Sequence, residues 1–198
     1  MYKDDLDKLK KQVRRKLFLE RKKLDKTFIL EKSKEIQIKL FSLPEYIKTD
    51  TIMFYISYDN EVYTHAMIQD SIKQGKNIVV PKVNGGILIP SILTSWSELT
   101  IGSYNILEPK QIKPVMLEDI NIVIVPGIGF DIYGHRIGHG RGYYDRFLRE
   151  IKSIKIGLAF DFQILQEIPY EEHDIEMDKI ITEKRIIECD KNGQNNER

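Results

Sequence analysis

Cysteine is nearly absent from this chain of 198 residues, in which Cys189 stands alone. A single cysteine excludes an internal disulfide framework and favours a reducing compartment. Long hydrophobic runs are missing too: the longest, such as Ile120–Pro126, are far too short to span a bilayer. The N-terminus is charged and lacks the apolar segment of a secretory signal. We therefore predict a cytoplasmic protein with no membrane partner.

Histidine and net charge are also low, and each excludes a class of function. The four histidines, His65, His135, His139 and His173, form no HExxH zinc motif. The formal net charge of +1 argues against a dedicated nucleic-acid binder. Residues 1–26 nevertheless hold eleven Lys/Arg against five Asp/Glu. This basic run is either a solvated helix face or a surface that leans over an anionic ligand.

Hydrophobic residues make up 41% and charged residues 31% of the chain, a globular composition. An apolar stripe at helical spacing predicts an amphipathic helix over residues 4–25; its members are Leu6, Leu9, Val13, Leu17 and Leu24. Beyond it, apolar strand-like segments alternate with helical ones. The expected strands are 51–58, 77–83, 87–93, 120–126, 155–160 and 179–188 (the last a strand or hairpin), and the expected helices are 27–41, 62–74 and 143–152.

This alternation predicts an α/β fold, a three-layer sandwich with a mostly parallel central sheet and helices on both faces. The length suits one domain, residues 1–198, with a disordered tail from about residue 190. Ligands of such sheets bind outside the carboxyl ends of the strands. Three segments follow predicted strands at that edge: Tyr55–Glu61, Pro81-Lys82 and Pro126–Phe130. One shared site is therefore expected there.

The most informative segment is RIGHGRGYYD, which runs from Arg136 to Asp145. It places a glycine at every second position, at Gly138, Gly140 and Gly142. Glycines allow positive φ and let backbone N–H groups approach an anion, and the predicted helix start adds further N–H groups. The pattern is neither a Walker A motif nor a dinucleotide fingerprint. We predict a phosphate cradle, with a tight structural turn as the alternative.

The segments VPGIGFD, RIGHGRGYYDRFL and HDIEMDKIITE resemble the 5-formyltetrahydrofolate cyclo-ligase (5,10-methenyltetrahydrofolate synthetase) family. SYDNEVYT, VPKV, GSYNILEP and the basic N-terminal helix support the resemblance, which extends from about residue 3 to 188. It implies an ATP- and Mg²⁺-dependent ring closure. ATP would phosphorylate the N5-formyl oxygen, N10 would attack the activated carbon, and phosphate would leave to give 5,10-methenyltetrahydrofolate and ADP. Phosphoryl transfer of this kind needs positioning and charge neutralisation rather than a protein nucleophile.

The resemblance also implies a set of site residues. ATP would contact Lys10, Arg14, Arg136, Ile137, Gly138, His139, Gly140, Arg141, Gly142, Tyr143 and Tyr144. The folate, with or without a polyglutamate tail, would contact Ile56, Glu61, Tyr104, His139 and Tyr143. Mg²⁺ would bind Asp145 and Asp178, and the catalytic residues would be Arg136, Arg141 and Tyr143.

From the residues alone, several alternatives stay open. Lys10 and Arg14 share a helix face and are otherwise surface charges. Glu61 is otherwise a helix cap, and Asp145 an acid that favours a helix N-terminus. The rival functions are a sugar-phosphate isomerase or CoA-transferase-like enzyme, which needs no ATP, and an RNA-binding module, which binds more weakly at high salt. We expect a monomer that binds small molecules and no nucleic acid.

Overall fold

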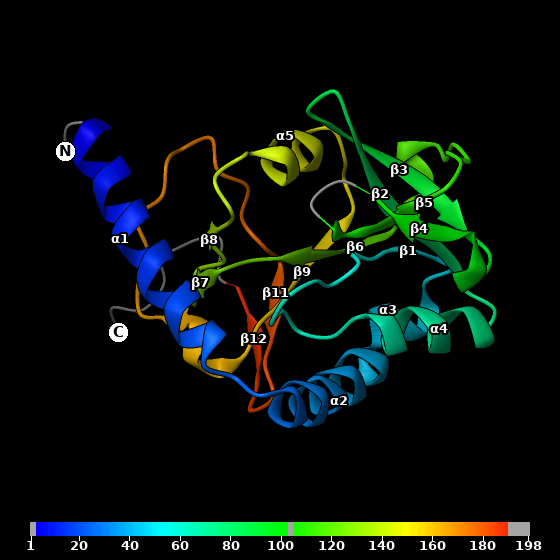
Figure 1. Cartoon of the computed structure of the whole chain (residues 1–198), viewed down its shortest axis with the longest axis horizontal. Helices are drawn as coiled ribbons and strands as arrows, with labels where there is room; N and C mark the ends of the chain where they lie inside the picture. The colour runs from blue at the N-terminus through cyan, green and yellow to red at the C-terminus, as the bar shows by residue number, and fades with distance from the viewer. Residues whose placement is uncertain (1–2, 103–104, 190–198) are drawn as a thin grey trace.

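The computed structural model describes residues 3–102 and 105–189. Its centre is a seven-stranded sheet in the order β12-β11-β9-β6-β1-β2-β3 (Figure 1). The strands are β1 Thr51–Met53, β2 Asn77–Asn84, β3 Ile87–Leu93, β6 Ile122–Pro126, β9 Ile154–Leu158, β11 Lys179–Ile181 and β12 Ile186–Glu188. The inner strands β2, β1, β6, β9 and β11 pair in parallel, and the edge strands β3 and β12 are antiparallel. The expected mostly parallel sheet is confirmed.

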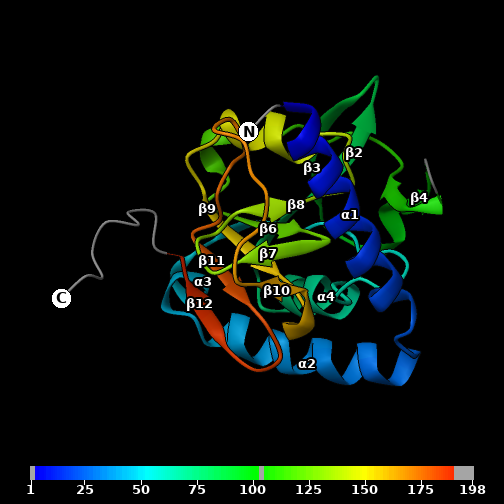
Figure 2. The same cartoon turned by 90° about the vertical axis from the view of Figure 1, so that its left-hand side faces the viewer.

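Helices cover both faces of the sheet, as the three-layer sandwich requires. α2 (Lys26–Ser42), α3 (Pro44–Lys48) and α4 (His65–Lys73) lie on one face, and α5 (Tyr143–Arg149) lies on the other (Figure 1). The basic helix α1 (Lys3–Lys22) stands across the end of the sandwich, against β7 (Gly129–Asp131) (Figure 2). This position leaves one long side of α1 facing the carboxyl edge of the sheet.

The central strand β6 shows why the layers form. Its residues Ile122 to Val125 are completely buried, as expected for a parallel strand covered on both faces. Successive side chains alternate between two cores: Ile122 and Ile124 pack with residues of α2 and α4, whereas Val123 and Val125 pack with Phe147 and Leu148 of α5. Hydrophobic burial on both faces therefore fixes the sheet between the helices.

Two predicted elements are shorter than expected. Of the strand predicted over 51–58, only Thr51–Met53 joins the sheet. Beyond it the Thr64 hydroxyl replaces a neighbouring strand: it donates to the Tyr55 carbonyl at 2.7 Å and accepts from the Ser57 N–H at 3.0 Å. The helix predicted over 62–74 begins only at His65 for the same reason. The freed segment turns toward the carboxyl edge of the sheet.

The remaining elements are short. β10 (Ile164–Leu165), β7 and β8 (Arg136–Ile137) form a three-stranded sheet, and β4 (Leu99–Ile101) pairs with β5 (Leu107–Pro109). Single 3₁₀ turns occupy Trp96–Glu98, Leu117–Asp119 and Asp161–Gln163. The chain end forms the expected hairpin, β11–β12, while the tail predicted from residue 190 lies outside the described residues. Within the described residues, no helix has the length and apolarity needed to cross a membrane.

Candidate active site

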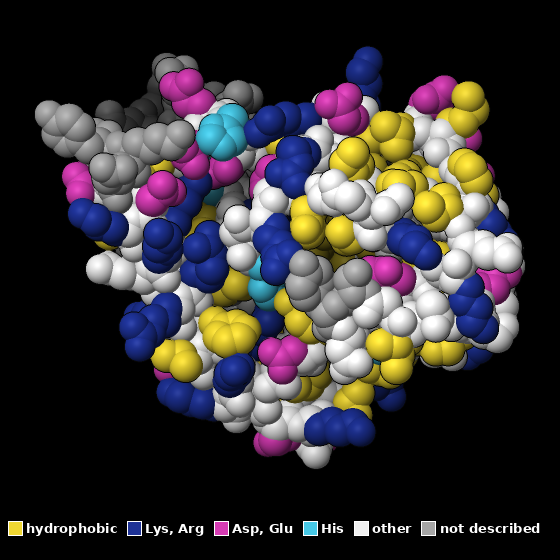
Figure 3. Space-filling model, turned by 45° about the horizontal axis from the view of Figure 1, so that its top comes forward, with side chains coloured by type: hydrophobic (Ala, Val, Ile, Leu, Met, Phe, Trp, Pro, Cys, Tyr) yellow, Lys and Arg dark blue, Asp and Glu magenta, His cyan; other side chains and the backbone are white. Residues whose placement is uncertain are grey.

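A cavity of about 880 Å³ opens at the carboxyl ends of β1, β2 and β6. Its walls come from α1, the segment after β1, the β2–β3 hairpin, the glycine loop with the start of α5, and the segment 171–174. In the space-filling view, Lys and Arg side chains gather around a hollowed surface that also shows hydrophobic and His side chains (Figure 3). The carboxyl edge of the sheet is thus where one site forms, as predicted.

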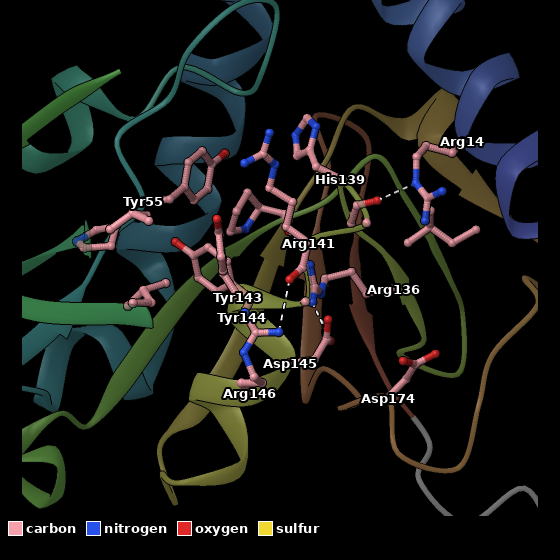
Figure 4. A pocket seen from close by; sticks show the side chains of 18 of the residues that line it. Arg14, Tyr55, Arg136, His139, Arg141, Tyr143, Tyr144, Asp145, Arg146 and Asp174 are labelled. Carbon is pink, nitrogen blue, oxygen red and sulfur yellow. Dashed lines mark hydrogen bonds and ion pairs between the residues drawn. The ribbon is translucent and has the colours of Figure 1, made fainter. Parts of the chain in front are cut away.

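The structure brings nearly all the predicted site residues to this cavity. The residues that line it are Lys10, Arg14, Ile56, Glu61, Arg136, Ile137, Gly138, His139, Gly140, Arg141, Gly142, Tyr143, Tyr144 and Asp145. Several of them face one another across the cavity from different elements (Figure 4). Tyr104 lies outside the described residues.

Asp178 is the exception, and its predicted place beside Asp145 is wrong. It does not line the cavity; its Oδ2 accepts a hydrogen bond from the Lys155 N–H at 2.7 Å. Asp178 directly precedes β11, so it lies at the amino edge of the parallel strands, whereas the cavity lies at their carboxyl edge. The acid that does line the cavity is Asp174, four residues earlier, in the connection that climbs over the sheet between β10 and β11 (Figure 1).

The glycine loop owes its shape to backbone freedom and close approach. Gly140 and Gly142 have φ of +89° and +65°, which side-chain-bearing residues rarely adopt. A Cβ at Gly138 would lie 2.7 Å from Nη1 of Arg136, so that side chain also needs the glycine. The Gly138 carbonyl accepts a hydrogen bond from Nε of Arg14 at 2.8 Å (Figure 4). The loop is therefore joined to the basic face of α1.

Arg136 connects the sheet, the loop and α5. Its side chain is 4% exposed; Nη2 donates to Oδ1 of Asp145 at 2.6 Å, and Nη1 donates to the Pro126 carbonyl at the end of β6 at 3.2 Å. The guanidinium also lies 5.8 Å from the ring centre of Tyr144, and its Nε has no hydrogen-bond partner among the described residues. A cation is thus held rigidly under the loop.

Other arginines at the cavity bind carbonyl groups rather than carboxylates. Nη1 and Nη2 of Arg146 donate to the carbonyls of Arg141 and Gly86, at 3.1 and 3.0 Å, and Nη2 of Arg149 donates to the His173 carbonyl at 3.1 Å. A carbonyl does not neutralise a guanidinium, so these contacts leave positive charge at the cavity. An anionic ligand is attracted to this end of it.

Lys10 of α1 forms an ion-pair cluster with two acids at the edge of the cavity. Its Nζ lies 2.9 Å from Glu171 and 2.6 Å from Asp174. Burial opposes the charge on Lys10, but the hydrogen bonds outweigh it and raise the pKa of Lys10. Burial likewise opposes ionisation of Asp174, yet the contact with Lys10 lowers the pKa of Asp174, as it does that of Glu171. With His173, these two acids place ligand atoms within 4.8 Å of one another, an arrangement that could hold a cation.

The opposite end of the cavity is aromatic and apolar, and the buried acid Glu61 borders it. Tyr55, Ile56, Tyr143, Tyr144 and Leu88 line it. Burial, and secondarily the charge on Glu61, raises the pKa of Tyr144 and of Tyr55 well above the usual value, so both phenols stay neutral. Planar rings fit between such side chains.

Glu61 lies where this apolar end meets the glycine loop. Its side chain is 5% exposed, and Oε2 accepts a hydrogen bond from the Tyr58 N–H at 3.2 Å. Nε2 of His139, from the loop, lies 3.3 Å from Oε1 of Glu61, and the Tyr58 hydroxyl lies within 3.4 Å of the same imidazole. His139 thus joins the anion-binding end to the apolar end.

Sequence reasoning missed several residues of the cavity. Tyr55 and Tyr58 belong to the segment that was expected as strand, and Arg146 follows the recognised loop by one helical turn. Local spacing gives no signal for Glu171. It offers Asp174 only as one of three neighbouring acids, with Glu176 and Asp178, and does not choose among them. Arg21, which is buried behind the cavity and does not line it, was missed as well, although a charge four residues after Leu17 interrupts the apolar stripe of the helix.

Comparison with known proteins agrees with this geometry. A model of the 5-formyltetrahydrofolate cyclo-ligase family matches residues 7–183. The chain belongs to this family. The mouse 5-formyltetrahydrofolate cyclo-ligase is 32% identical over 160 residues, which cover 73% of this chain and 79% of the mouse protein. The Escherichia coli K12 enzyme is 29% identical over 166 residues, covering 80% of this chain and 91% of its own.

Solved structures extend the agreement to the whole fold. The NMR structure of the 5,10-methenyltetrahydrofolate synthetase of Aquifex aeolicus superposes with a TM-score of 0.85 and 32% identity, covering 96% of this chain and 97% of that one. Cyclo-ligases of this family convert 5-formyltetrahydrofolate to 5,10-methenyltetrahydrofolate, so the chain is an enzyme of the cyclo-ligase class. The predicted α/β fold and family are both confirmed.

Proposed function

We propose that this cavity uses ATP to close the ring of 5-formyltetrahydrofolate, through phosphorylation of the formyl oxygen. The observation that supports it best is that one cavity joins an arginine-rich glycine loop to an aromatic end bordered by the buried acid Glu61. The first end suits a triphosphate, and the second suits a pterin. Two enzymes similar to this chain act on this folate by name, which supports the choice of substrate.

The folate occupies the aromatic end in this proposal. The Glu61 carboxylate accepts hydrogen bonds from the N–H and amino groups on one edge of the pterin, while Ile56 and Tyr143 contact its rings. The buried position of Glu61 makes these hydrogen bonds strong, because little water competes for them. His139 lies between Glu61 and the loop, where the formyl group would meet the phosphate.

The phosphates lie along the glycine loop, with Lys10 and Arg14 reaching them from α1. Arg136 and Arg141 face the charge that develops during transfer, and Tyr143 borders both substrates. The formyl oxygen takes the γ-phosphoryl group, with ADP as leaving group. N10 then attacks the formyl carbon and gives up its proton, the bond from that carbon to the phosphorylated oxygen breaks, and inorganic phosphate leaves.

The carboxylates at the cavity fit a magnesium ion. Asp145 lines the cavity beside Arg136, and Glu171 and Asp174 line the side next to α1. Their hard oxygen donors are of the kind that Mg²⁺ prefers when it also binds phosphate oxygens. We assign Asp145 as the protein ligand, with Asp174 in place of Asp178. When bound, the metal neutralises phosphate charge. A cytoplasmic location, a single domain and a monomeric state stay predictions.

One experiment tests the proposal directly. The purified full chain is mixed with 5-formyltetrahydrofolate, ATP and Mg²⁺, and the absorbance of the methenyl product is followed together with released phosphate. We expect one phosphate per methenyl group, with no product when ATP is omitted. Product without ATP, or a folded protein that forms none with it, would overturn the proposal. A second test replaces ATP with a non-hydrolysable analogue, which should bind and give no product.

A further inference from the structure

Arg21 is a completely buried cation that the proposed function does not use. Its side chain is 1% exposed, and Nε, Nη1 and Nη2 all lack a hydrogen-bond partner among the described residues. Burying a guanidinium without partners costs several kcal/mol. Such a residue persists only where its charge is compensated nearby.

The compensating charge is that of Glu61. Nη1 of Arg21 lies 3.8 Å from Oε1 of Glu61, and no other carboxylate of the described residues lies within 4.0 Å of this guanidinium. Arg21 does not line the main cavity. It borders a separate narrow gap behind Glu61, which is too small for a water molecule and whose wall also includes Tyr55 and Gln163. Glu61 lines both spaces, so it faces the ligand on one side and Arg21 on the other.

The surrounding contacts hold Arg21 in this place. Its carbonyl and that of Leu24 accept hydrogen bonds from the Asn60 side chain, at 3.0 and 3.1 Å, which ties the end of α1 to the residue next to Glu61. The guanidinium also lies 5.9 Å from the ring centre of Phe18. The charge is therefore fixed beside the segment that carries Glu61 and cannot swing into the cavity.

We propose that Arg21 is a positioning residue for the folate site, which acts from behind by pairing with the Glu61 carboxylate and keeping it aimed into the cavity. The inference rests on the proposed contact between Glu61 and the pterin. A carboxylate accepts two pterin hydrogen bonds only when it is ionised and fixed in direction. His139 approaches the same oxygen, Oε1, from the loop, but it is partly exposed and neutral when unprotonated, so it does not replace the buried charge.

The test compares four variants of the full chain: Arg21→Met, Arg21→Lys, Glu61→Gln and the double variant of Arg21→Met with Glu61→Gln. Methionine keeps the apolar stem and removes the charge. We expect Arg21→Met to raise KM for 5-formyltetrahydrofolate roughly 10- to 100-fold, the effect of losing a charge-assisted contact. KM for ATP should stay within about twofold, since Arg21 does not line the cavity in which the phosphates are proposed to bind. Arg21→Lys should restore most of the folate affinity, because it restores the charge.

The double variant separates positioning from mere packing. If Arg21 acts through Glu61, Arg21→Met adds nothing to the folate KM once Glu61 is Gln. An Arg21→Met effect of the same size in both backgrounds, or an unchanged folate KM in folded Arg21→Met, would overturn the inference. Arg15→Met is the matched control, since Arg15 is an exposed arginine of the same helix and should leave both KM values unchanged.

Other outcomes distinguish this inference from the proposed function. An unchanged folate KM in Glu61→Gln refutes the pterin contact itself, whereas a raised KM in Glu61→Gln together with a normal KM in Arg21→Met refutes only the role of Arg21. If Arg21→Met does not fold, thermal unfolding decides. Glu61→Gln then leaves a buried cation alone and should lower the midpoint, and the double variant should regain part of it. An unchanged midpoint in Glu61→Gln would contradict the pairing.

Discussion

Arg136→Met tests the centre of the site most directly. Arg136 is a buried cation with two hydrogen bonds, to Asp145 at 2.6 Å and to the Pro126 carbonyl at 3.2 Å. Methionine keeps the apolar stem of the side chain and removes both contacts and the charge. In the proposed mechanism this charge faces the transferring phosphoryl group, so its loss should act mainly on turnover.

The geometry gives the expected size of two effects of Arg136→Met, one on stability and one on turnover. Loss of a charge-assisted pair costs about 2 kcal/mol of unfolding free energy, because Asp145 is 23% exposed and water replaces part of the contact. For a chain of this length that corresponds to a fall of about 4–8 °C in Tm. A separate effect concerns catalysis. Loss of preorganised charge in a phosphoryl transition state raises the activation free energy by about 3–4 kcal/mol, which lowers kcat roughly 10²- to 10³-fold.

The assay measures methenyl absorbance at saturating substrates, at a temperature where circular dichroism shows each variant to be folded. Arg185→Met is the control for turnover, since it removes an arginine–aspartate contact, to Asp161 at 3.0 Å, that lies outside the cavity. Its kcat should equal that of the unmodified chain. A folded Arg136→Met variant with kcat within about threefold would refute the reasoning, and Arg136 would then only support the fold.

Three further predictions concern the loop, the acids and α1. Gly140→Ala and Gly75→Ala both place alanine at a positive φ, of +89° and +80°, and each should lower the unfolding free energy by about 1 kcal/mol. Only Gly140→Ala should also raise KM for ATP, by about tenfold. Equal KM values in the two variants would contradict a phosphate-binding loop. Asp145→Asn should raise the Mg²⁺ concentration needed for half-maximal turnover, whereas Asp178→Asn should lower Tm alone; the reverse result would restore Asp178 as a ligand. Lys10 lowers the pKa of the two acids beside it from 3.8 and 4.5, so its contribution to unfolding free energy is complete at neutral pH and is lost as pH falls through the lowered values. The stability difference between the unmodified chain and Lys10→Met should therefore shrink below about pH 4 in denaturant titrations, and a pH-independent difference would argue against this ion-pair cluster.

The glycine loop and its partners were predictable because their chemistry is local. The alternating spacing of Gly138, Gly140 and Gly142 alone predicts a loop with freedom to adopt positive φ, as Gly140 and Gly142 do. The i,i+4 relation of Lys10 and Arg14 places both on one face of α1. The parallel sheet then carries such segments to one edge, since alternating strands and helices leave the carboxyl ends together. Residue type, spacing and topology indicated this part of the site, and the family resemblance assigned roles to its residues.

The choice between Asp174 and Asp178 was not predictable in the same way. Both acids belong to HDIEMDKIITE, and nothing in their spacing shows that one lies over the carboxyl edge and the other at the amino edge. The difference depends on where β11 begins and on the ion pair between Asp174 and Lys10, two residues 164 positions apart. Long-range packing of a connection without regular structure decides such cases, and local pattern does not carry that information.

The charges of this cavity explain how a chain with a net charge of +1 can build an anion site. Lys10 is paired with Asp174, and Arg136 with Asp145, each partner coming from a different element. These pairs stabilise the site without a ligand, because buried charges left alone would be costly. In the proposed function, the nucleotide phosphates bind the cations and a divalent ion binds the carboxylates. Each ion pair of the protein is then replaced by two interactions with the ligands, and the charge stays balanced. It follows that the effects of Arg136→Met and Asp145→Asn on unfolding free energy should not be additive. Each single variant leaves the charge of the other residue without its partner, whereas the double variant removes both charges.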